Sequence, residues 1–247
     1  MAVREKKIYS GKILEIEIYN ITKLERSKSR KKKLKESLNK QKNINNKNAR
    51  KQLTRLANTN FTDKDLAVHL TYDNKNLPQS EEEAKKDVVN YIRRLNHYRK
   101  KRGIPPVKYI AVIEFKEQQE GKDIRMHHHM FMDGLVDRDT VENIWAKGRA
   151  NADRLKSDEF GYEGLSRYIS KDPKGKKRWM QSRGLIQPTI RINDNKYSNK
   201  KMWTLSKCQG DKEELQKLYP GYIVTDFYVE INKYIGTQIL MKMRKLE

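Results

Sequence analysis

The sequence predicts an α+β fold in which helices flank a central antiparallel sheet. Short segments alternate apolar and polar side chains, as half-buried strands do, and longer segments repeat apolar side chains at helical spacing. Their order along the chain is strand, helix, strand, strand, helix, helix. This order favours neighbouring strands that run antiparallel. With 247 residues, the chain has room for one large domain, or for one domain and an appendage.

The predicted strands come from four segments. In residues 12–20, Leu14, Ile16 and Ile18 face one side and two glutamates face the other, so residues 1–22 are expected to supply the first strand of the core. Residues 65–73, with the sequence DLAVHLTYD, predict a compact strand. Two further strands, 107–115 and 125–134, are predicted in tandem.

Three helices are predicted between and after these strands. Ser80 and Glu83 form a capping box, and a long amphipathic helix should follow it until Gly103. Residues 137–156 have helical apolar spacing, and residues 163–173 predict a shorter helix that ends near Pro173. The tail, 200–247, contains the strand-like segments MWTLS and FYVEI.

Residues 23–57 differ abruptly from their surroundings. From Lys23 to Arg55 there are 14 basic and 2 acidic residues, a local net charge of +12, with no glycine or proline. The stretch is interpreted as a basic helical arm inserted into the fold, with a break near residues 43–48. A disordered basic linker is the alternative interpretation.

The overall charge bounds the class of partner. A formal net charge of +23 favours a polyanion, which is nucleic acid or an anionic membrane. No apolar stretch approaches the roughly 20 residues that span a bilayer, and residues 1–10 lack the apolar core of a signal peptide. Cys208 is the single cysteine, which excludes an internal disulfide and a multi-cysteine zinc module. We therefore expect a cytoplasmic protein that binds nucleic acid.

Three consecutive histidines lie on the predicted strand 125–134. Alternate side chains of a strand share a face, so His127 and His129 should stand side by side while His128 points away. If the two tandem strands form a hairpin, Glu114 lies near the level of His127. Two imidazoles and a carboxylate suit Mg²⁺ or Mn²⁺ holding phosphate oxygens. A surface histidine run without metal, or a structural zinc site, remains the alternative.

A tyrosine follows on the last predicted helix. Tyr168 and Lys171 are three residues apart, and so share a helix face. A phenol has a pKa near 10, so a neighbouring cation and a metal-polarised phosphodiester would both help it attack phosphorus. Tyr162 is the alternative nucleophile. A basic strip for the DNA backbone is expected nearby, formed by Lys174, Lys176, Lys177, Arg178 and Arg183.

Together these motifs resemble the HUH endonuclease superfamily, named for two histidines that flank one residue. Within it the chain resembles the rolling-circle replication initiators of plasmids and phages, including the filamentous-phage gene II-like group. Four segments carry the resemblance: VHLTYD, YIAVIEF, HHHMFMDG and RYISKDPKGKKRW, all within residues 65–190. Family members commonly have a bulky apolar residue where this chain has His128, so the sequence leaves open which two of the three histidines bind metal.

The resemblance implies a sheet related to the RNA-recognition-motif or ferredoxin-like topology, with the nuclease domain and a C-terminal extension in 58–247. It implies that Glu114, His127 and His129 hold Mg²⁺ or Mn²⁺ opposite Tyr168. Tyr168 would attack single-stranded origin DNA, giving a 5′-phosphotyrosine and a free 3′-hydroxyl that primes rolling-circle replication. The setting is the cytoplasm of a bacterial host cell, where a host helicase and polymerase are candidate partners.

Two alternatives remain open from the sequence. A relaxase or a single-strand transposase uses the same chemistry. A non-catalytic nucleic-acid-binding protein would instead use the histidines for structure alone.

Overall fold

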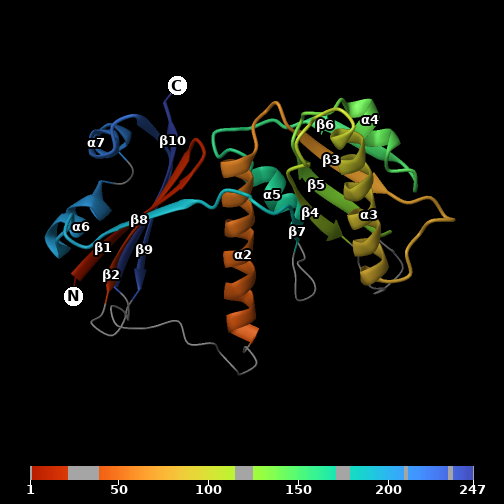
Figure 1. Cartoon of the computed structure of the whole chain (residues 1–247). Coiled ribbons are helices and arrows are strands. Elements are labelled where there is room, and N and C mark those ends of the chain that lie inside the picture. Colours follow the sequence, from red (N-terminus) through yellow and green to blue (C-terminus); the bar gives the residue numbers. More distant parts are fainter. Residues whose placement is uncertain are drawn as a thin grey trace. The chain divides into compact units, whose positions relative to one another are not determined.

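The computed structural model describes residues 2–21, 39–114, 125–170, 179–208, 211–232 and 236–246 (Figure 1). The chain divides into two compact units. The central unit comprises residues 49–157 and 162–186, and the terminal unit comprises residues 1–48, 158–161 and 187–247. The predicted α+β class is confirmed, and both units contain a five-stranded antiparallel sheet.

The sheet of the central unit has the strand order β6-β3-β5-β4-β7. Its first four strands in chain order are arranged fourth, first, third, second, with a helix after the first and another after the third. This is the order of the RNA-recognition-motif topology that the resemblance implies. The strands are β3 (Leu66–Thr71), β4 (Tyr109–Glu114), β5 (His127–Met132), β6 (Ala150–Arg154) and β7 (Met180–Gln181).

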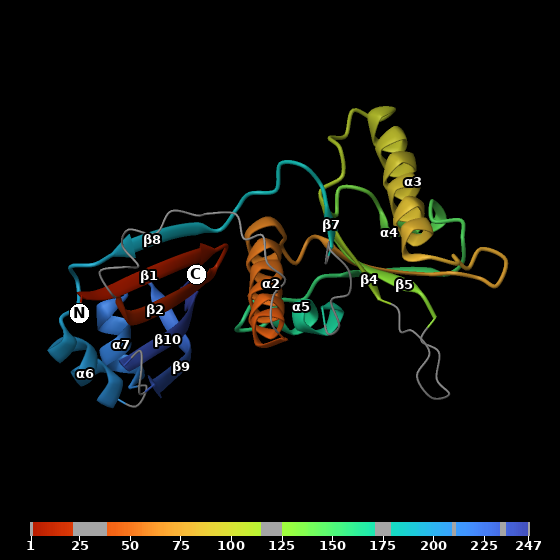
Figure 2. The same cartoon turned by 90° about the horizontal axis from the view of Figure 1, so that it is seen from below.

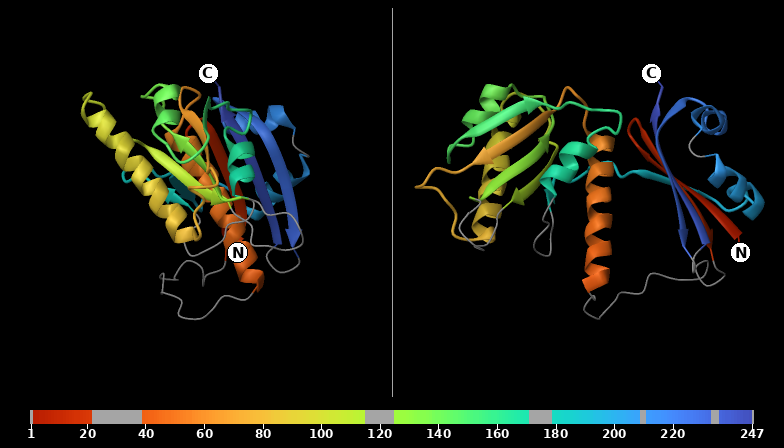
Figure 3. Two further views of the ribbon diagram at one scale, coloured as in Figure 1. Left: turned by 90° about the vertical axis from the view of Figure 1, so that its right-hand side faces the viewer. Right: turned by 180° about the vertical axis from the view of Figure 1, so that it is seen from behind.

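Helices cover both faces of this sheet (Figure 3). On one face lie α3 (Glu81–Lys100) and α4 (Arg138–Asn143). On the other lie α2 (Asn39–Asn60) and α5 (Glu163–Ile169), where Leu53 and Ile169 pack in one core with Phe131 of β5. Because strands alternate their side chains, β5 is held between two separate apolar cores. The central strand is therefore fixed on both sides.

Helix α3 begins and ends as its sequence predicts. Ser80 is the N-cap, and its side chain accepts a hydrogen bond from the Glu83 amide at 3.2 Å. The Glu83 carboxylate bonds back to the amide of Gln79 rather than to the cap residue itself. The chain turns away at Gly103, which has a φ of +68°. The apolar stripe of Val88, Tyr91, Ile92 and Leu95 is buried.

The helix predicted over 137–156 is wrong in its second half. Helix α4 ends at Asn143, and residues 150–154 form β6, which pairs with β3 at the sheet edge. Two features end the helix. Trp145 turns inward, and its indole donates to the Thr71 carbonyl at 2.7 Å. Gly148 takes a φ of +153°, a backbone conformation that L side chains rarely adopt.

The basic arm is described from residue 39 onward, and residues 22–38 lie outside the described part of the chain. The break expected near residues 43–48 is absent, because α2 runs without interruption from Asn39 to Asn60. Asparagine is a weak helix former, but the segment has no glycine or proline, and Leu53, Leu56 and Ala57 bury one face of the helix. The role of the arm in binding DNA remains a prediction.

In the terminal unit the sheet has the strand order β8-β1-β2-β10-β9, and two helices pack against one of its faces (Figure 2). Ile16, Ile18 and Met241 lie in the core under the helices. The strands are β1 (Ala2–Ser10), β2 (Ile13–Ile21), β8 (Thr189–Asn193), β9 (Tyr222–Asn232) and β10 (Gly236–Lys245), and the helices are α6 (Asn199–Lys207) and α7 (Lys212–Leu218).

Two expectations for this unit differ from the structure. The sequence predicts one strand of the main core in residues 1–22, yet these residues form two strands of the terminal unit's sheet, joined at Gly11 with a φ of +60°. The polar run at residues 4–7 conceals the strand character of β1. The segment MWTLS lies within α6, where Met202 and Leu205 are buried three residues apart on one helix face, whereas FYVEI lies in β9 as expected.

Among the described residues, no helix combines the length and the apolar character that crossing a membrane requires.

Candidate metal and nucleophile site

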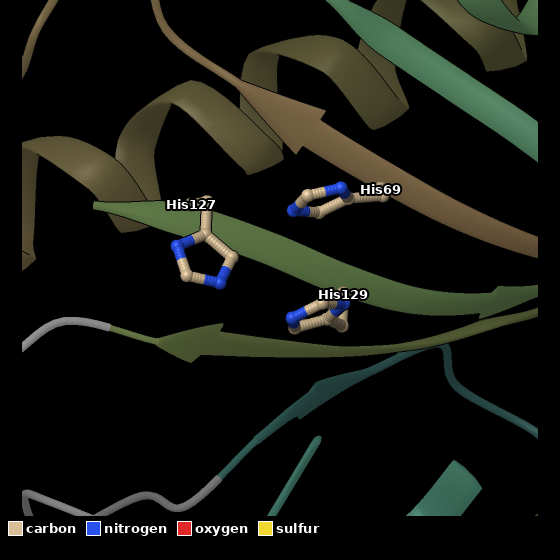
Figure 4. A group of neighbouring side chains, drawn as sticks. All are labelled: His69, His127 and His129. Carbon is tan, nitrogen blue, oxygen red and sulfur yellow. The ribbon is translucent and has the colours of Figure 1, made fainter. Parts of the chain in front are cut away.

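Strand β5 separates its three histidines between the two faces of the sheet. His127 and His129 point to the same side of β5 (Figure 4), which is the face that carries α2 and α5. His128 lies on the opposite face. The His128 side chain is fully buried, and its Nε2 lies 2.6 Å from the Tyr72 hydroxyl oxygen. Its ring also packs edge-on against Trp145. The pair that shares a face is therefore His127 and His129.

A third imidazole, which the sequence interpretation missed, completes the cluster. His69 of β3 is the direct cross-strand neighbour of His129, and the two rings stack with centroids 4.6 Å apart. Its ring centroid lies 5.1 Å from that of His127. Each histidine has a ring nitrogen within 4.8 Å of a ring nitrogen of the other two (Figure 4). The available signal is a histidine on the predicted strand 65–73, but only the β3–β5 pairing shows what it faces.

Glu114 brings a carboxylate to the same cluster. It is the direct cross-strand neighbour of His127 in the β4–β5 ladder. Its Oε2 lies 3.4 Å from Nε2 of His127 and 3.3 Å from Nε2 of His129. A divalent ion with ligands at about 2.1 Å holds adjacent ligand atoms about 3 Å apart. The two distances from the Glu114 oxygen are close to those between ligand atoms around one cation.

The ring nitrogens of the cluster are available to bind. Nδ1 of His127 lies 2.8 Å from the Arg125 carbonyl oxygen, which fixes the proton on Nδ1 and leaves Nε2 as the acceptor. Nε2 of His69 and Nε2 of His129 are buried and have no hydrogen-bond partner among the described residues. Buried polar atoms are ordinarily satisfied. Two such atoms side by side fit a cation that they would hold.

Burial keeps two of these imidazoles neutral, which is the form that binds metal. It lowers the pKa of His129 to about 3, and the neighbouring imidazoles His69 and His127 lower it further. The pKa of His69 is also lowered, first by burial and then by His127. On the other face, burial lowers the pKa of His128 to about 3 as well, so this ring serves as a neutral packing group.

Tyr168 lies beside the cluster. Helix α5 carries it over the sheet, and its ring meets that of His129 edge-on, with centroids 5.4 Å apart. The residue is 50% exposed, so the phenol is accessible from solvent. Ile169 is buried in the core, and Nε of Arg50 donates to the Ser170 carbonyl at 3.0 Å. These contacts fix the last turn of α5, and with it the position of Tyr168.

Tyr162 is placed differently. It is 5% exposed, and its hydroxyl donates to Oδ1 of Asp63 at 2.8 Å. Burial raises the pKa of Tyr162 above its ordinary value, and the hydrogen bond to Asp63 raises it further. Its ring packs against Phe131, two residues along the strand from His129. These are the surroundings of a packing residue.

The predicted basic strip is only partly visible. Arg183 is exposed in the turn after β7. Lys171, the predicted neighbour of Tyr168, lies outside the described part of the chain. So do the other predicted residues of the strip, which are Lys174, Lys176, Lys177 and Arg178. Their roles stay predictions.

Comparison with known proteins gave one match. The model of the family of replication-associated proteins ORF2/gene II protein matches residues 65–173, a segment that runs from β3 through the histidine strand to α5. No curated protein matches the chain. No solved structure matches it either. The matched segment contains His69, Glu114, the histidines of β5 and Tyr168. The match confirms the predicted resemblance. In this segment the chain is similar to the replication-associated proteins of that family, which is consistent with a rolling-circle replication protein of phage or plasmid type.

Proposed function

We propose that the chain is a replication initiator that nicks single-stranded DNA with Tyr168, using a divalent cation held by His69, His127, His129 and Glu114. The observation that carries the proposal is the edge-on approach of Tyr168 to His129, which brings a solvent-accessible phenol beside a ready set of metal ligands. The match of residues 65–173 to a family of replication-associated proteins supports the role in replication, and with it a DNA partner.

Three imidazoles and one carboxylate favour Mn²⁺ over Mg²⁺, because Mg²⁺ prefers oxygen ligands and retains its waters. When bound, the cation would polarise the scissile phosphodiester. Glu114 would contribute the charge of the ligand set, and Arg125 would orient His127 through its carbonyl. His128 would take no part, because it faces the opposite core.

The reaction is a transesterification. The phenol oxygen of Tyr168 forms a bond to phosphorus, and the bond from phosphorus to the 3′ oxygen breaks. The phenol proton ends on the departing 3′ oxygen, so atoms and charge balance without a further reactant. The products are a 5′-phosphotyrosine and a 3′-hydroxyl that a polymerase extends. Tyr168 is favoured over Tyr162 because the Tyr162 phenol is buried and already donates a hydrogen bond to Asp63.

The test is formation of a covalent adduct. The full chain is incubated with Mn²⁺ and a labelled pool of single-stranded oligonucleotides of random sequence, and adducts are separated on denaturing gels. We expect an adduct that is lost in Tyr168→Phe and retained in Tyr162→Phe. Tyr228→Phe is a matched control, since Tyr228 is 55% exposed, close to the exposure of Tyr168, and lies in the terminal unit.

Two outcomes would contradict the proposal. An adduct that persists in Tyr168→Phe and disappears in Tyr162→Phe would show that the chemistry belongs to the other tyrosine. Tight binding of the pool without any adduct, in the wild type as in the variants, identifies a non-catalytic nucleic-acid-binding protein.

A further inference from the structure

The terminal unit has a pocket of its own, lined by residues of that unit alone. It has a volume of about 220 Å³ and is lined by residues of β1 and β8. These two strands pair antiparallel at the edge of the sheet (Figure 2). Almost all of its lining side chains carry polar groups. Strand β1 supplies Glu5, Lys7 and Tyr9, and β8 supplies Arg191, Ile192 and Asn193.

The most unusual member of the lining is Glu5, a carboxylate that is only 2% exposed. Oε1 accepts a hydrogen bond from Nζ of Lys196 at 2.8 Å and another from the Tyr219 hydroxyl at 2.6 Å. The other oxygen, Oε2, lies 3.6 Å from Nζ of Lys7, beyond the reach of a short hydrogen bond. A buried charge is costly unless it is paired. Here one oxygen is anchored, while the other retains capacity to accept a hydrogen bond.

Cations lie near this carboxylate, and the Tyr9 ring lies four residues farther along β1. Lys7, Lys196 and Arg191 bring three positive charges against the one negative charge of Glu5, so the region attracts an anion. The Arg191 guanidinium lies 5.5 Å from the centre of the Tyr9 ring. A tyrosine ring beside cations is the arrangement that stacks bases and holds the backbone of single-stranded nucleic acid.

The polar groups offer both hydrogen-bond donors and acceptors. Asn193 uses its Oδ1 to accept from the Asn195 amide at 2.9 Å, which orients its NH₂ group as a donor. Lys7 and Arg191 can only donate, and Oε2 of the ionised Glu5 can only accept. A ligand that fits must therefore present N–H donors to one side and acceptors to the other.

We propose that this pocket binds one unpaired guanine base of single-stranded DNA. Guanine presents N1–H and N2–H₂ as adjacent donors, which suit Glu5, and O6 and N7 as acceptors, which suit Arg191 or Lys7. Adenine and cytosine place a ring acceptor beside their amino group, and a carboxylate repels that acceptor. Thymine has a single N–H. The inference rests on the proposed function, which makes single-stranded DNA the ligand, and gives the protein a means of selecting a site that does not involve its nuclease residues.

The pocket is tested by binding, without cleavage. Fluorescence anisotropy of the full chain in EDTA compares labelled thymidine octamers that carry one central guanine, adenine, cytosine or thymine. We expect the guanine octamer to bind about tenfold more tightly than the others, the discrimination that one well-formed base contact provides. Lys7→Ala and Arg191→Ala should each reduce this preference to less than about threefold.

Lys6→Ala is the matched control. Lys6 lies on the same strand and its side chain is 25% exposed, as is that of Lys7, but it faces the opposite side of the sheet, where it pairs with Glu17. Loss of Lys6 removes the same charge, so it should weaken all four octamers alike and leave the preference for guanine intact. Circular dichroism spectra serve to check that each variant is folded.

The outcomes separate this proposal from the nicking proposal. Equal binding of the four octamers by the wild type overturns the guanine pocket, as does a preference that survives both Lys7→Ala and Arg191→Ala. Competition by free deoxyguanosine monophosphate as strong as that by the octamer assigns the pocket to a free nucleotide and overturns the DNA assignment. A clear guanine preference in a protein that forms no tyrosine adduct leaves the pocket standing and removes only the nicking chemistry.

Discussion

Replacing His69 by alanine tests the metal site at the residue that sequence reasoning missed. In the wild type, the three imidazoles of the cluster lie close together, and Glu114 lies beside His127 and His129. His69 supplies one of the two buried Nε2 atoms that have no hydrogen-bond partner among the described residues. Without it, a cation bound as proposed would keep His127, His129 and Glu114. Loss of a residue that only supports a ligand weakens metal binding roughly 10- to 100-fold, so loss of a ligand should weaken it at least as much.

The consequence for thermal stability follows from mass action. With Mn²⁺ at about 100 times its dissociation constant, binding stabilises the wild type by about 2.7 kcal/mol. At the same Mn²⁺ concentration, affinity reduced roughly 10- to 100-fold leaves about 0.4–1.4 kcal/mol in His69→Ala. One kcal/mol raises the Tm of a protein of this size by about 3 °C. The Mn²⁺-induced rise in Tm should therefore fall from about 8 °C to about 1–4 °C.

The assay is a thermal melt of each protein with Mn²⁺ and with EDTA, accompanied by calorimetric titration of Mn²⁺. His97→Ala is the control, since His97 is exposed on α3, on the other side of the sheet from the cluster. It should keep the full Mn²⁺-induced rise. An equal rise in His69→Ala and the wild type would show that His69 is not a ligand. No rise in either protein would refute the metal site as a whole.

Two substitutions test the structure that supports the site. Asp133→Ala leaves the fully buried guanidinium of Arg99 without its bidentate partner and should lower the free energy of unfolding in urea by about 3–5 kcal/mol. The control Asp153→Ala removes an exposed ion pair and should lower it by less than about 1 kcal/mol. Equal losses of stability in the two variants would contradict this ranking. Gly148→Ala would place a Cβ 2.5 Å from the Thr71 carbonyl oxygen at a φ of +153° and should lower the free energy of unfolding by more than about 1 kcal/mol; an unchanged Tm would show that the loop adjusts.

The parts of the site that the sequence predicted are those set by local geometry. Period-two alternation determines that His127 and His129 share a face, and a hairpin of two tandem strands brings Glu114 level with His127. The short helix that carries Tyr168 is visible from its own spacing. In each case the residues that interact are near in sequence, or the connection between them is simple.

The parts that were missed depend on pairing between distant segments. His69 meets His129 only because β3 pairs with β5, far along the chain, in one register. The edge strand β6 carries a pattern that also fits a helix, and its pairing with β3 decides between the two. The same holds for β1, whose polar run is accommodated because neighbouring strands of the terminal sheet lie on both sides of it. Local propensity does not contain this information.

The burial of His128 ties the register of β5 to the formation of the histidine cluster. A slip by one residue would turn His127 and His129 toward Tyr72 and Trp145, and would leave His128 as the only histidine of the strand on the other side. A chain misfolded in this way would lose two imidazoles from the cluster at once. The space beside Tyr72 and Trp145 would then have to hold two imidazole rings in place of one. The middle histidine thus links correct assembly of the sheet to the assembly of the histidine cluster on one of its faces.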